Sequence, residues 1–425
     1  MKPISATLQT TYANLLQAHM NRPSFEFEGA PFLRALNKKK YWYANHRSAP
    51  GSPLKQRYLG PDSDEMRTRV AEMQARGQNQ ADFRDHASGL IAQLRAGGIA
   101  GPDRKTGPVL RVLTNSGVFR LGGILVGTHA FRHYDLVLGV HLSDSTSWVT
   151  QTDDIDIASF ENFSMAIEDT ADPDLANALM KLGFNPAPSL TPKTPTSWTL
   201  PDASYAIDFL TPSFRDDEKP AKLAALNMWA QGLHYLEFLI ADPIDAVSPY
   251  MEGLLVRVPR PERYAIHKLI ISQRRRKASN AKARKDIEQA RSIIWAMSGH
   301  LNHELKVAIA EADAMGPKWR EALDKALNIE FKASSLSYNF LRDVIHLEGE
   351  AFGGRSMLFA VSGEALEDHF GATTTDEVAS KQGAARKNRS KIEALIKRKF
   401  RSEPSPETVL TTDDVERFLK ADTKR

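Results

Sequence analysis

The sequence contains no cysteine and no long apolar segment. The absence of cysteine from the 425 residues excludes disulfide bonds, thiolate zinc sites, iron–sulfur clusters and cysteine nucleophiles, and it favours a reducing compartment. No apolar run approaches the roughly 18 residues that a membrane helix needs. Residues 1–6 also lack the apolar core of a secretion signal. We therefore expect a cytoplasmic protein that has no membrane partner.

The sequence also has little excess charge of one sign, and what excess there is lies in two segments. With 56 Lys and Arg against 52 Asp and Glu, the net charge is +4. Residues 268–291 carry a net charge of +7 and residues 381–401 carry +8, which leaves −11 for the remainder. Concentrated basic segments indicate a phosphate-rich partner such as nucleic acid. Two solvated helix faces are the alternative interpretation.

Hydrophobic periodicity predicts alternating strands and helices. At 42% hydrophobic and 25% charged residues, the composition is that of a globular protein with two or three domains. Helical spacing predicts helices over residues 5–20, 64–96 (with a possible break at Gly77), 108–117, 127–139 and 173–182. Strand patterns cover residues 40–45, 55–59, 121–126, 154–158, 197–200, 205–210 and 253–258. Residues 50–53 read as a turn, residues 233–240 are ambiguous, and helices follow from Pro261 to about residue 333. The fold class is α/β, in the α+β sense.

Asp154 and Asp156 form the strongest local signal. In a strand, alternate side chains share a face, so these two carboxylates lie together while Ile155 and Ile157 point into a core. Two carboxylates on an otherwise buried strand repel each other and are costly to desolvate. A divalent cation relieves this conflict, and Mg²⁺ prefers carboxylate and phosphate oxygens. Solvated acids at a strand end are the alternative.

A strand-to-helix turn and an isolated acid extend this site. Gly127 lets the backbone approach a phosphate, and Thr128 adds a hydroxyl at the start of a helix; a plain capping threonine is the alternative. Asp208 is an acid inside an apolar strand. The alternative is that it is a hydrogen-bonded polar residue at the end of the strand, with no role in a site. If its strand neighbours Asp154 and Asp156, three carboxylates converge in the layout needed to hold two metal ions.

A helical lysine is the fourth candidate. Lys268 shares a helix face with Tyr264 and Ile271, from which it could reach a nucleotide phosphate. A lysine whose stem packs while its ammonium group stays in water is the alternative. Asp286 is a weaker candidate.

The order of these elements resembles the DNA polymerase beta superfamily of nucleotidyltransferases. The resemblance is carried by Gly127-Thr128, then Asp154-Ile155-Asp156, then Asp208. It implies Mg²⁺ (or Mn²⁺) held by the three aspartates and an NTP as substrate. The chain is also similar to abortive-infection and toxin–antitoxin nucleotidyltransferases, which implies site roles for Lys268 and Asp286. Where many members have serine in the turn, this chain has Thr128, which keeps the hydroxyl.

A closer resemblance links residues 1–330 to a bacterial family of nucleotidyltransferase-fold proteins with unassigned substrate. It rests on segments 41–43, 56–63, 117–131, 152–158, 258–261 and 267–269. Residues from 365 onward resemble a small bacterial domain of unknown function. The implied organisation is a helical and hairpin region (1–107), a nucleotidyltransferase core with a mixed sheet (108–260), a helical segment that completes the site (261–335) and a small α+β domain (340–425).

The acceptor hydroxyl stays open at this stage. The basic runs 268–291 and 381–401 favour RNA, for example a tRNA end, while a protein hydroxyl or a small molecule is the alternative. A toxin–antitoxin or phage-defence setting would add a small partner protein. A non-catalytic scaffold that only binds nucleic acid or a partner is the competing function.

Overall fold

The computed structural model describes residues 1–21, 30–36, 39–46, 55–143, 148–161, 170–187, 193–214, 218–275, 280–373 and 377–423. It confirms a mixed α/β architecture of the α+β kind, and the turn expected at residues 50–53 lies outside the described residues. The chain divides into two compact units. The first comprises residues 1–4, 112–244 and 257–425, and the second comprises residues 5–111 and 245–256. In the described ranges, every helix is too short or too polar to cross a membrane.

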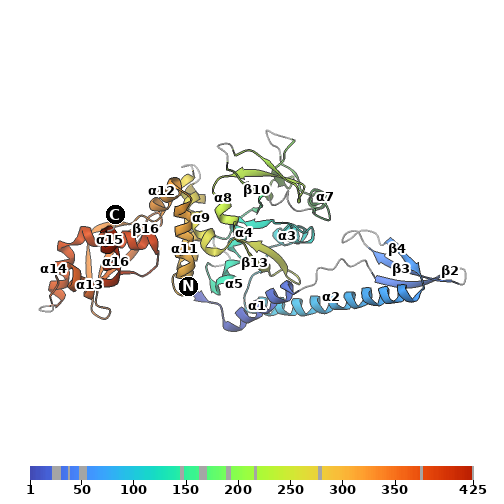
Figure 1. The fold of residues 1–425 in the computed structure, drawn as a ribbon, viewed down its shortest axis with the longest axis horizontal. Coiled ribbons are helices and arrows are strands. Elements are labelled where there is room, and N and C mark those ends of the chain that lie inside the picture. The colour runs from blue at the N-terminus through green and yellow to red at the C-terminus, as the bar shows by residue number, and fades with distance from the viewer. Residues whose placement is uncertain are drawn as a thin grey trace. The chain divides into compact units, whose positions relative to one another are not determined.

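A long helix dominates the second unit (Figure 1). Helix α2 begins after Ser63, whose hydroxyl accepts a hydrogen bond from the backbone N–H of Met66, and it continues without a break through Gly77 to the cap at Gly97. Helix α2 contacts a three-stranded antiparallel sheet of order β2-β3-β4, of which β2 was not expected from the sequence. The bounds are α1 Ala6–Met20, β2 Ala30–Leu36, β3 Lys39–His46, β4 Lys55–Pro61 and α2 Asp64–Ala96. Two elements lie partly in each unit, α3 (Thr106–Asn115) and the β13–β14 pair (Ile244–Ser248, Leu254–Val258).

A mixed sheet forms the centre of the first unit. Its main path runs β11-β12-β10-β7-β5, where β10 is parallel to both β7 and β12, and β7 is antiparallel to β5. Strand β9 pairs with β10 and with β8, and a separate short pair joins β1 and β6. The strands are β1 Lys2–Pro3, β5 Ile124–Val126, β6 Val140–His141, β7 Asp154–Ala158, β8 Asn185–Pro186, β9 Ser197–Thr199, β10 Ala206–Pro212, β11 Ala221–Leu223 and β12 Met228–Leu233.

Short helices follow the strands, and a helical segment follows the sheet. The helix expected over residues 127–139 is two helices, α4 (Gly127–Phe131) and α5 (Tyr134–Leu138), and α5 ends at Gly139 with φ +68°. The ambiguous stretch 233–240 contains α8 (Leu236–Ile240). Pro261 opens α9 at its first turn, as expected. The remaining helices are α7 Leu175–Lys181, α9 Pro261–Arg274, α10 Asn280–Met297, α11 Asn302–Ala314 and α12 Pro317–Ala326.

The C-terminal part forms a four-stranded sheet with helices. The sheet has the order β15-β16-β17-β18, and its first strand begins at Glu330. The expectation that helices continue to residue 333 is therefore wrong at its end, because residues from Glu330 onward pair with β16. The elements are β15 Glu330–Asn339, β16 Val344–Ala351, β17 Arg355–Ser362, α13 Gly363–Phe370, α14 Glu377–Lys387, α15 Arg389–Ser402, β18 Thr408–Leu410 and α16 Thr412–Asp422.

Candidate active site

Strand pairing brings the three aspartates together. Strands β7 and β10 are parallel, and their register places Asp208 beside Asp156 and Ala206 beside Asp154. Because side chains alternate along a strand, the three carboxylates share one face of the sheet. The intervening Ile155 and Ile207 are fully buried on the other face. Strand β10 therefore has the same alternation as Asp154-Ile155-Asp156 in β7, with its acid and its isoleucine on the same sides of the sheet.

The three carboxylates form a compact group of oxygen ligands. One oxygen from each of Asp154, Asp156 and Asp208 lies within 4.8 Å of the other two, and all three residues are half-buried. Hard carboxylate oxygens in a convergent set are the donors that Mg²⁺ and Mn²⁺ prefer. The residues present therefore fit a divalent cation.

Burial and mutual repulsion perturb two of these acids. Burial, together with the negative charges of Asp154 and Asp208, raises the pKa of Asp156 to about 7. Burial also raises the pKa of Asp208, against a hydrogen bond with the Ser197 side chain that lowers it. A site that holds acids in this state gains free energy when a positive charge enters.

Gly127 lies directly against this group. It follows β5, whose Val126 pairs with Asp156 across the sheet, and its φ of +65° is in the left-handed region. A Cβ atom at this position would lie 2.0 Å from Asp156 Oδ2. Both the conformation and the close approach require glycine here. The turn that the sequence singled out for phosphate contact therefore borders the carboxylate group.

The turn at Gly127 and Thr128 is hydrogen-bonded to two residues, Gln289 and Tyr264, that the sequence pattern did not assign to the site. The Thr128 side chain is buried, and its Oγ1 lies 3.5 Å from Gln289 Nε2. The same amide donates to the Val149 carbonyl at 2.9 Å. Tyr264 Oη lies 3.0 Å from the Gly127 carbonyl oxygen and 2.9 Å from Gln289 Oε1. Helices α9 and α10 thus fix the turn after β5.

Helical spacing was the signal that could have found these two residues. Tyr264 lies four residues before Lys268 on α9, and Gln289 lies three residues after Asp286 on α10. Residues at these spacings share a helix face.

Lys268 and Asp286, the two later candidates, form an ion pair with each other. Lys268 Nζ lies 2.7 Å from Asp286 Oδ1, and both side chains are buried. Asp286 Oδ2 also accepts a hydrogen bond from Arg275 Nε at 2.5 Å. Burial alone would raise the pKa of Asp286, but the charges and hydrogen bonds of Lys268 and Arg275 lower it below its ordinary value. Lys268 still acts on the carboxylate group, since its charge lowers the pKa of Asp156.

Other cations of the first basic run lie on α10. Lys282 and Arg284 are exposed, and the charge of Lys282 lowers the pKa values of Asp156 and Asp208. Lys285 donates to the Gln151 carbonyl, and burial together with the charge of Lys268 lowers its pKa to about 8. Lys277 lies outside the described residues. This run therefore supplies exposed positive charge close enough to influence the acids.

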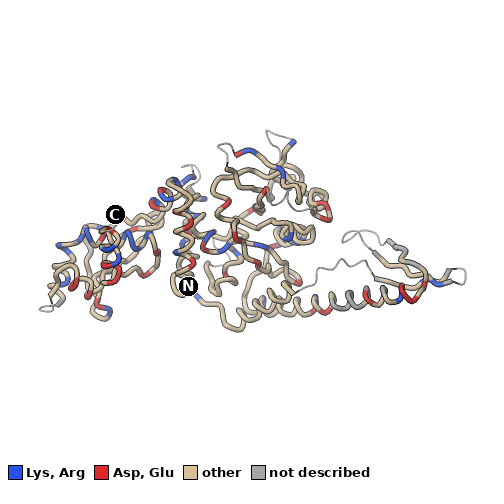
Figure 2. Tube along the Cα trace, viewed as in Figure 1, with Lys and Arg blue, Asp and Glu red and all other residues tan. Residues whose placement is uncertain are grey.

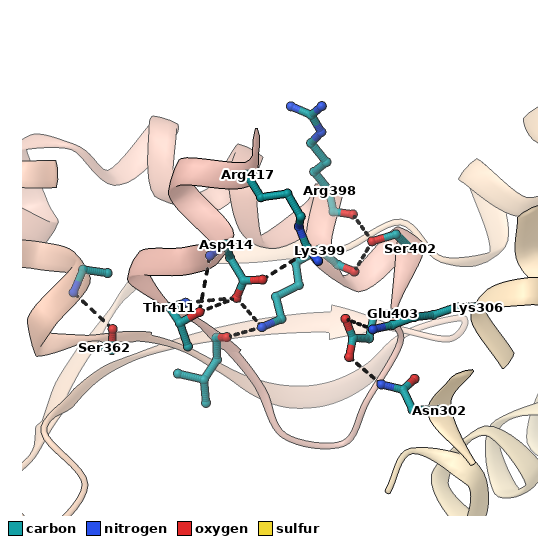
Figure 3. Close-up of polar contacts among 12 residues, drawn as sticks. Asn302, Lys306, Ser362, Arg398, Lys399, Ser402, Glu403, Thr411, Asp414 and Arg417 are labelled. Atoms are coloured by element: carbon teal, nitrogen blue, oxygen red, sulfur yellow. Dashed lines mark hydrogen bonds and ion pairs between the residues drawn. The ribbon is translucent and has the colours of Figure 1, made fainter. Parts of the chain in front are cut away.

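The second basic run is largely engaged in ion pairs within the chain. It spans part of α14 and α15 up to residue 401, and Figure 2 shows that both basic and acidic residues occur in the C-terminal part of the chain. In Figure 3, Asp414 accepts from Lys399, from Arg417 and from the Thr411 backbone at the start of α16. Five of the nine cations have acidic partners: Lys381 with Asp343 and Glu367, Arg389 with Glu393, Arg398 with Asp422, Lys399 with Asp414, and Arg401 with Asp313 and Asp324. Arg386, Lys387, Lys391 and Lys397 are exposed.

Comparison with known proteins gives one result for the core. No significant match was found among curated proteins or among solved structures. Residues 104–314 match the model of a family described as Nucleotidyltransferase. The matched range contains the three aspartates, the turn at Gly127 and Thr128, and the Lys268–Asp286 pair. The match supports a nucleotidyltransferase domain over residues 104–314.

Proposed function

We propose that the protein transfers a nucleoside monophosphate from an NTP to an acceptor hydroxyl in a Mg²⁺- or Mn²⁺-dependent reaction, as a member of the DNA polymerase beta superfamily. The observation that carries this proposal is the group of three carboxylates within 4.8 Å of one another inside the range that matches the nucleotidyltransferase family. A scaffold that only bound nucleic acid would gain nothing from three clustered acids that repel phosphate.

In the reaction, the acceptor oxygen forms a bond to the α-phosphorus while the bond from that phosphorus to the pyrophosphate oxygen breaks. Asp154, Asp156 and Asp208 would hold the divalent cation, which when bound offsets negative charge on the phosphates and activates the acceptor hydroxyl. We also assign to Asp208 the role of taking the acceptor proton.

The remaining site residues would bind and position the triphosphate. Gly127 brings the backbone close to the acids without a side chain, and backbone N–H groups at the start of α4 can donate to phosphate oxygens. The hydroxyl of Thr128 is buried against Gln289, so we assign the contact chiefly to the backbone of the turn. Lys268 would offset phosphate charge while Asp286, itself bound by Arg275, holds its ammonium group, which makes Asp286 a positioning residue.

The acceptor that we favour is RNA, for example a tRNA end, with the exposed Lys282 and Arg284 contacting phosphates. The setting that we propose is a bacterial toxin–antitoxin or phage-defence system with a small partner protein, on the basis of the resemblance alone.

The test is to incubate the protein with each α-³²P-labelled NTP, Mg²⁺ and total bacterial RNA or protein. We expect label in the RNA fraction, and no label with Asp156→Asn or with EDTA. Label in protein would identify a different acceptor. No label with any NTP, while binding to nucleic acid persists, would favour the non-catalytic scaffold.

A further inference from the structure

The strands of the β2–β3–β4 sheet in the second unit carry basic residues and no acidic ones. Residues 30–36, 39–46 and 55–61 contain five Lys and Arg and no Asp or Glu. Arg34 and Lys40 are exposed. The first acid after the strands, Asp62, is bound by Arg67 through both carboxylate oxygens, at 2.9 and 3.0 Å. Hydrogen bonds from Arg67, and to a smaller extent from Trp42, lower the pKa of Asp62 to about 2. Asp62 is thus already neutralised by Arg67 and leaves the positive charge of the strands in place.

One face of this sheet carries aromatic rings beside a guanidinium group. The register places Phe32 opposite Tyr43 and Arg34 opposite Tyr41, and residues that are opposite each other in an antiparallel pair share a face. The rings of Phe32 and Tyr43 stack with centroids 5.9 Å apart and planes inclined by 27°. Arg34 Cζ lies 6.0 Å from the centroid of the Tyr43 ring. Phe32, Tyr41 and Tyr43 all remain partly accessible. We call these four residues the aromatic face.

The opposite face carries the residue that links the sheet to α2. Leu33 pairs with Trp42 on this side, where Ala44 is fully buried and Leu33 and Lys40 are exposed. The Trp42 indole N–H donates to Asp62 at 3.0 Å, and Asp62 is bound to Arg67 of α2. Strands β2 and β4 both contact α2. The polar link to α2 therefore starts from the face opposite Tyr41 and Tyr43.

We infer that the aromatic face binds a single-stranded polynucleotide, with bases stacked on Tyr41 and Tyr43 and a phosphate paired with Arg34. Aromatic rings within a basic surface are the combination that binds single strands, because every base has a π-face and every linkage a negative charge. Arginine guanidinium planes also stack on unpaired bases. The binding uses none of the candidate catalytic residues and does not depend on nucleotide transfer.

Two other polyanions fit the same face less well. A duplex hides its base faces, so the rings would contribute little to its binding. A membrane surface requires apolar side chains that enter the lipid. In the described part of this sheet, Leu33 is the large apolar side chain classed as exposed, at 39%, and it lies on the opposite face.

The experiment measures equilibrium binding of the full-length protein by fluorescence anisotropy, over a series of salt concentrations and without NTP. The probes are labelled oligo(U) and oligo(dT) of about 20 nucleotides, longer than the footprints of about 4–16 nucleotides typical of single β-sheet binding domains. A DNA duplex of equal length and phosphatidylserine vesicles serve as comparison ligands. The variants are Arg34→Gln and Tyr41→Leu/Tyr43→Leu. The matched control is Arg320→Gln, which removes the same charge from an exposed position of α12.

We expect single strands to bind more tightly than the duplex and the vesicles. Arg34→Gln should flatten the plot of log Kd against log salt concentration by about 0.7 units, because each phosphate contact with a single strand contributes about that much. Tyr41→Leu/Tyr43→Leu should weaken binding at least about tenfold with an unchanged slope, because stacking is worth about 1–3 kcal/mol per base. The stronger of the oligo(U) and oligo(dT) complexes then identifies the sugar.

The inference fails if neither single strand binds at low salt, if the duplex or the vesicles bind as tightly, or if the control flattens the slope as much as Arg34→Gln. Circular dichroism checks the fold of each variant. Should the tyrosine variant not fold, the exposed Arg34 still decides the question through the salt slope.

Discussion

Asp286 binds two cations at once: its Oδ1 lies 2.7 Å from Lys268 Nζ and its Oδ2 lies 2.5 Å from Arg275 Nε. The aspartate is buried, and Arg275 is the more exposed of its two partners. Removal of Asp286 leaves two like charges together, whereas removal of Lys268 leaves Asp286 paired with Arg275. The two residues of the pair are therefore not equivalent for stability.

We predict that Asp286→Asn is more destabilising than Lys268→Met. Loss of one partner from a buried ion pair costs about 3–5 kcal/mol of folding stability. Asp286→Asn should fall in this range because it leaves two cations, Lys268 and Arg275, without their shared acidic partner. Lys268→Met should cost less. Urea unfolding measures both, with Lys325→Met as the control in the exposed Lys325–Glu321 pair, where we expect less than about 1 kcal/mol. An equal or larger loss for Lys268→Met would contradict the prediction.

The pKa of Asp156 predicts how pH and Mg²⁺ act on stability. Its pKa of about 7 lies above the ordinary value of 3.8, so between these values the folded state holds a proton that the unfolded state has lost. The contribution of Asp156 to stability without metal should therefore fall as pH rises from about 4 to about 7. Asp156→Asn removes this loss, so its melting temperature should exceed that of the wild type most clearly above pH 7.

Added Mg²⁺ should restore the wild type above pH 7 and leave Asp156→Asn nearly unchanged. A ligand at about 100 times its Kd stabilises the folded state by about 2.7 kcal/mol. Thermal unfolding at several Mg²⁺ concentrations measures the effect, with Ca²⁺ as a comparison ion. Equal Mg²⁺ stabilisation of both proteins would show that the ion binds elsewhere.

Much of the carboxylate site could be predicted because it depends on local alternation. The strand Asp154–Ala158 has the bounds that the pattern of acids and isoleucines predicts. The pairing of Asp208 with Asp156 could only be stated as a condition, since no local pattern says which strands become neighbours. The ion pair of Lys268 with Asp286 depends on how α9 packs on α10, which is also a property of the tertiary structure.

Gly127→Ala should abolish nucleotide transfer and Mg²⁺ stabilisation together. A Cβ atom 2.0 Å from Asp156 Oδ2 would displace that carboxylate, and φ of +65° is costly for alanine. The control is Gly89→Ala on the exposed side of α2, where a Cβ atom meets nothing within 4 Å. Because alanine is the better helix former by about 1 kcal/mol, this control should leave stability equal or higher. Mg²⁺ stabilisation that survives in Gly127→Ala would contradict the proposed arrangement.

Two buried histidines should make the fold sensitive to acid. Burial, reinforced by the charge of Lys268, lowers the pKa of His267 to about 3, and burial lowers that of His133 to about 4. Below pH 6.5 the unfolded state binds protons at these two histidines that the folded state does not bind. The stabilising contribution of the two histidines is therefore complete above pH 6.5 and is lost as pH falls toward 4. His267→Gln should therefore lose less stability between pH 7 and 5 than the wild type. Urea unfolding at both pH values tests this, with the exposed His303→Gln as the control.

The basic segments show the limits of counting charges along a sequence. Residues 381–401 stand out by their Lys and Arg content, yet five of their nine cations are paired with acids that are mostly distant in sequence. Strand β2 was missed because its sequence, Ala30–Leu36, lacks a clear alternation. Its pairing with β3 creates the basic aromatic face, which no single segment displays.

The register of β10 against β7 also links chemical competence to correct folding. A slip of one residue would bring Ile207 or Phe209 beside Asp156 in place of Asp208, and it would turn the Asp208 carboxylate toward the fully buried side occupied by Ile155 and Ile157. Burial of an unpaired carboxylate is strongly unfavourable, so the misaligned sheet is disfavoured by the same residue that completes the site. A misfolded chain would consequently be inactive as well as unstable. For the nucleotide transfer that we propose, only the correctly paired sheet therefore assembles the three carboxylates.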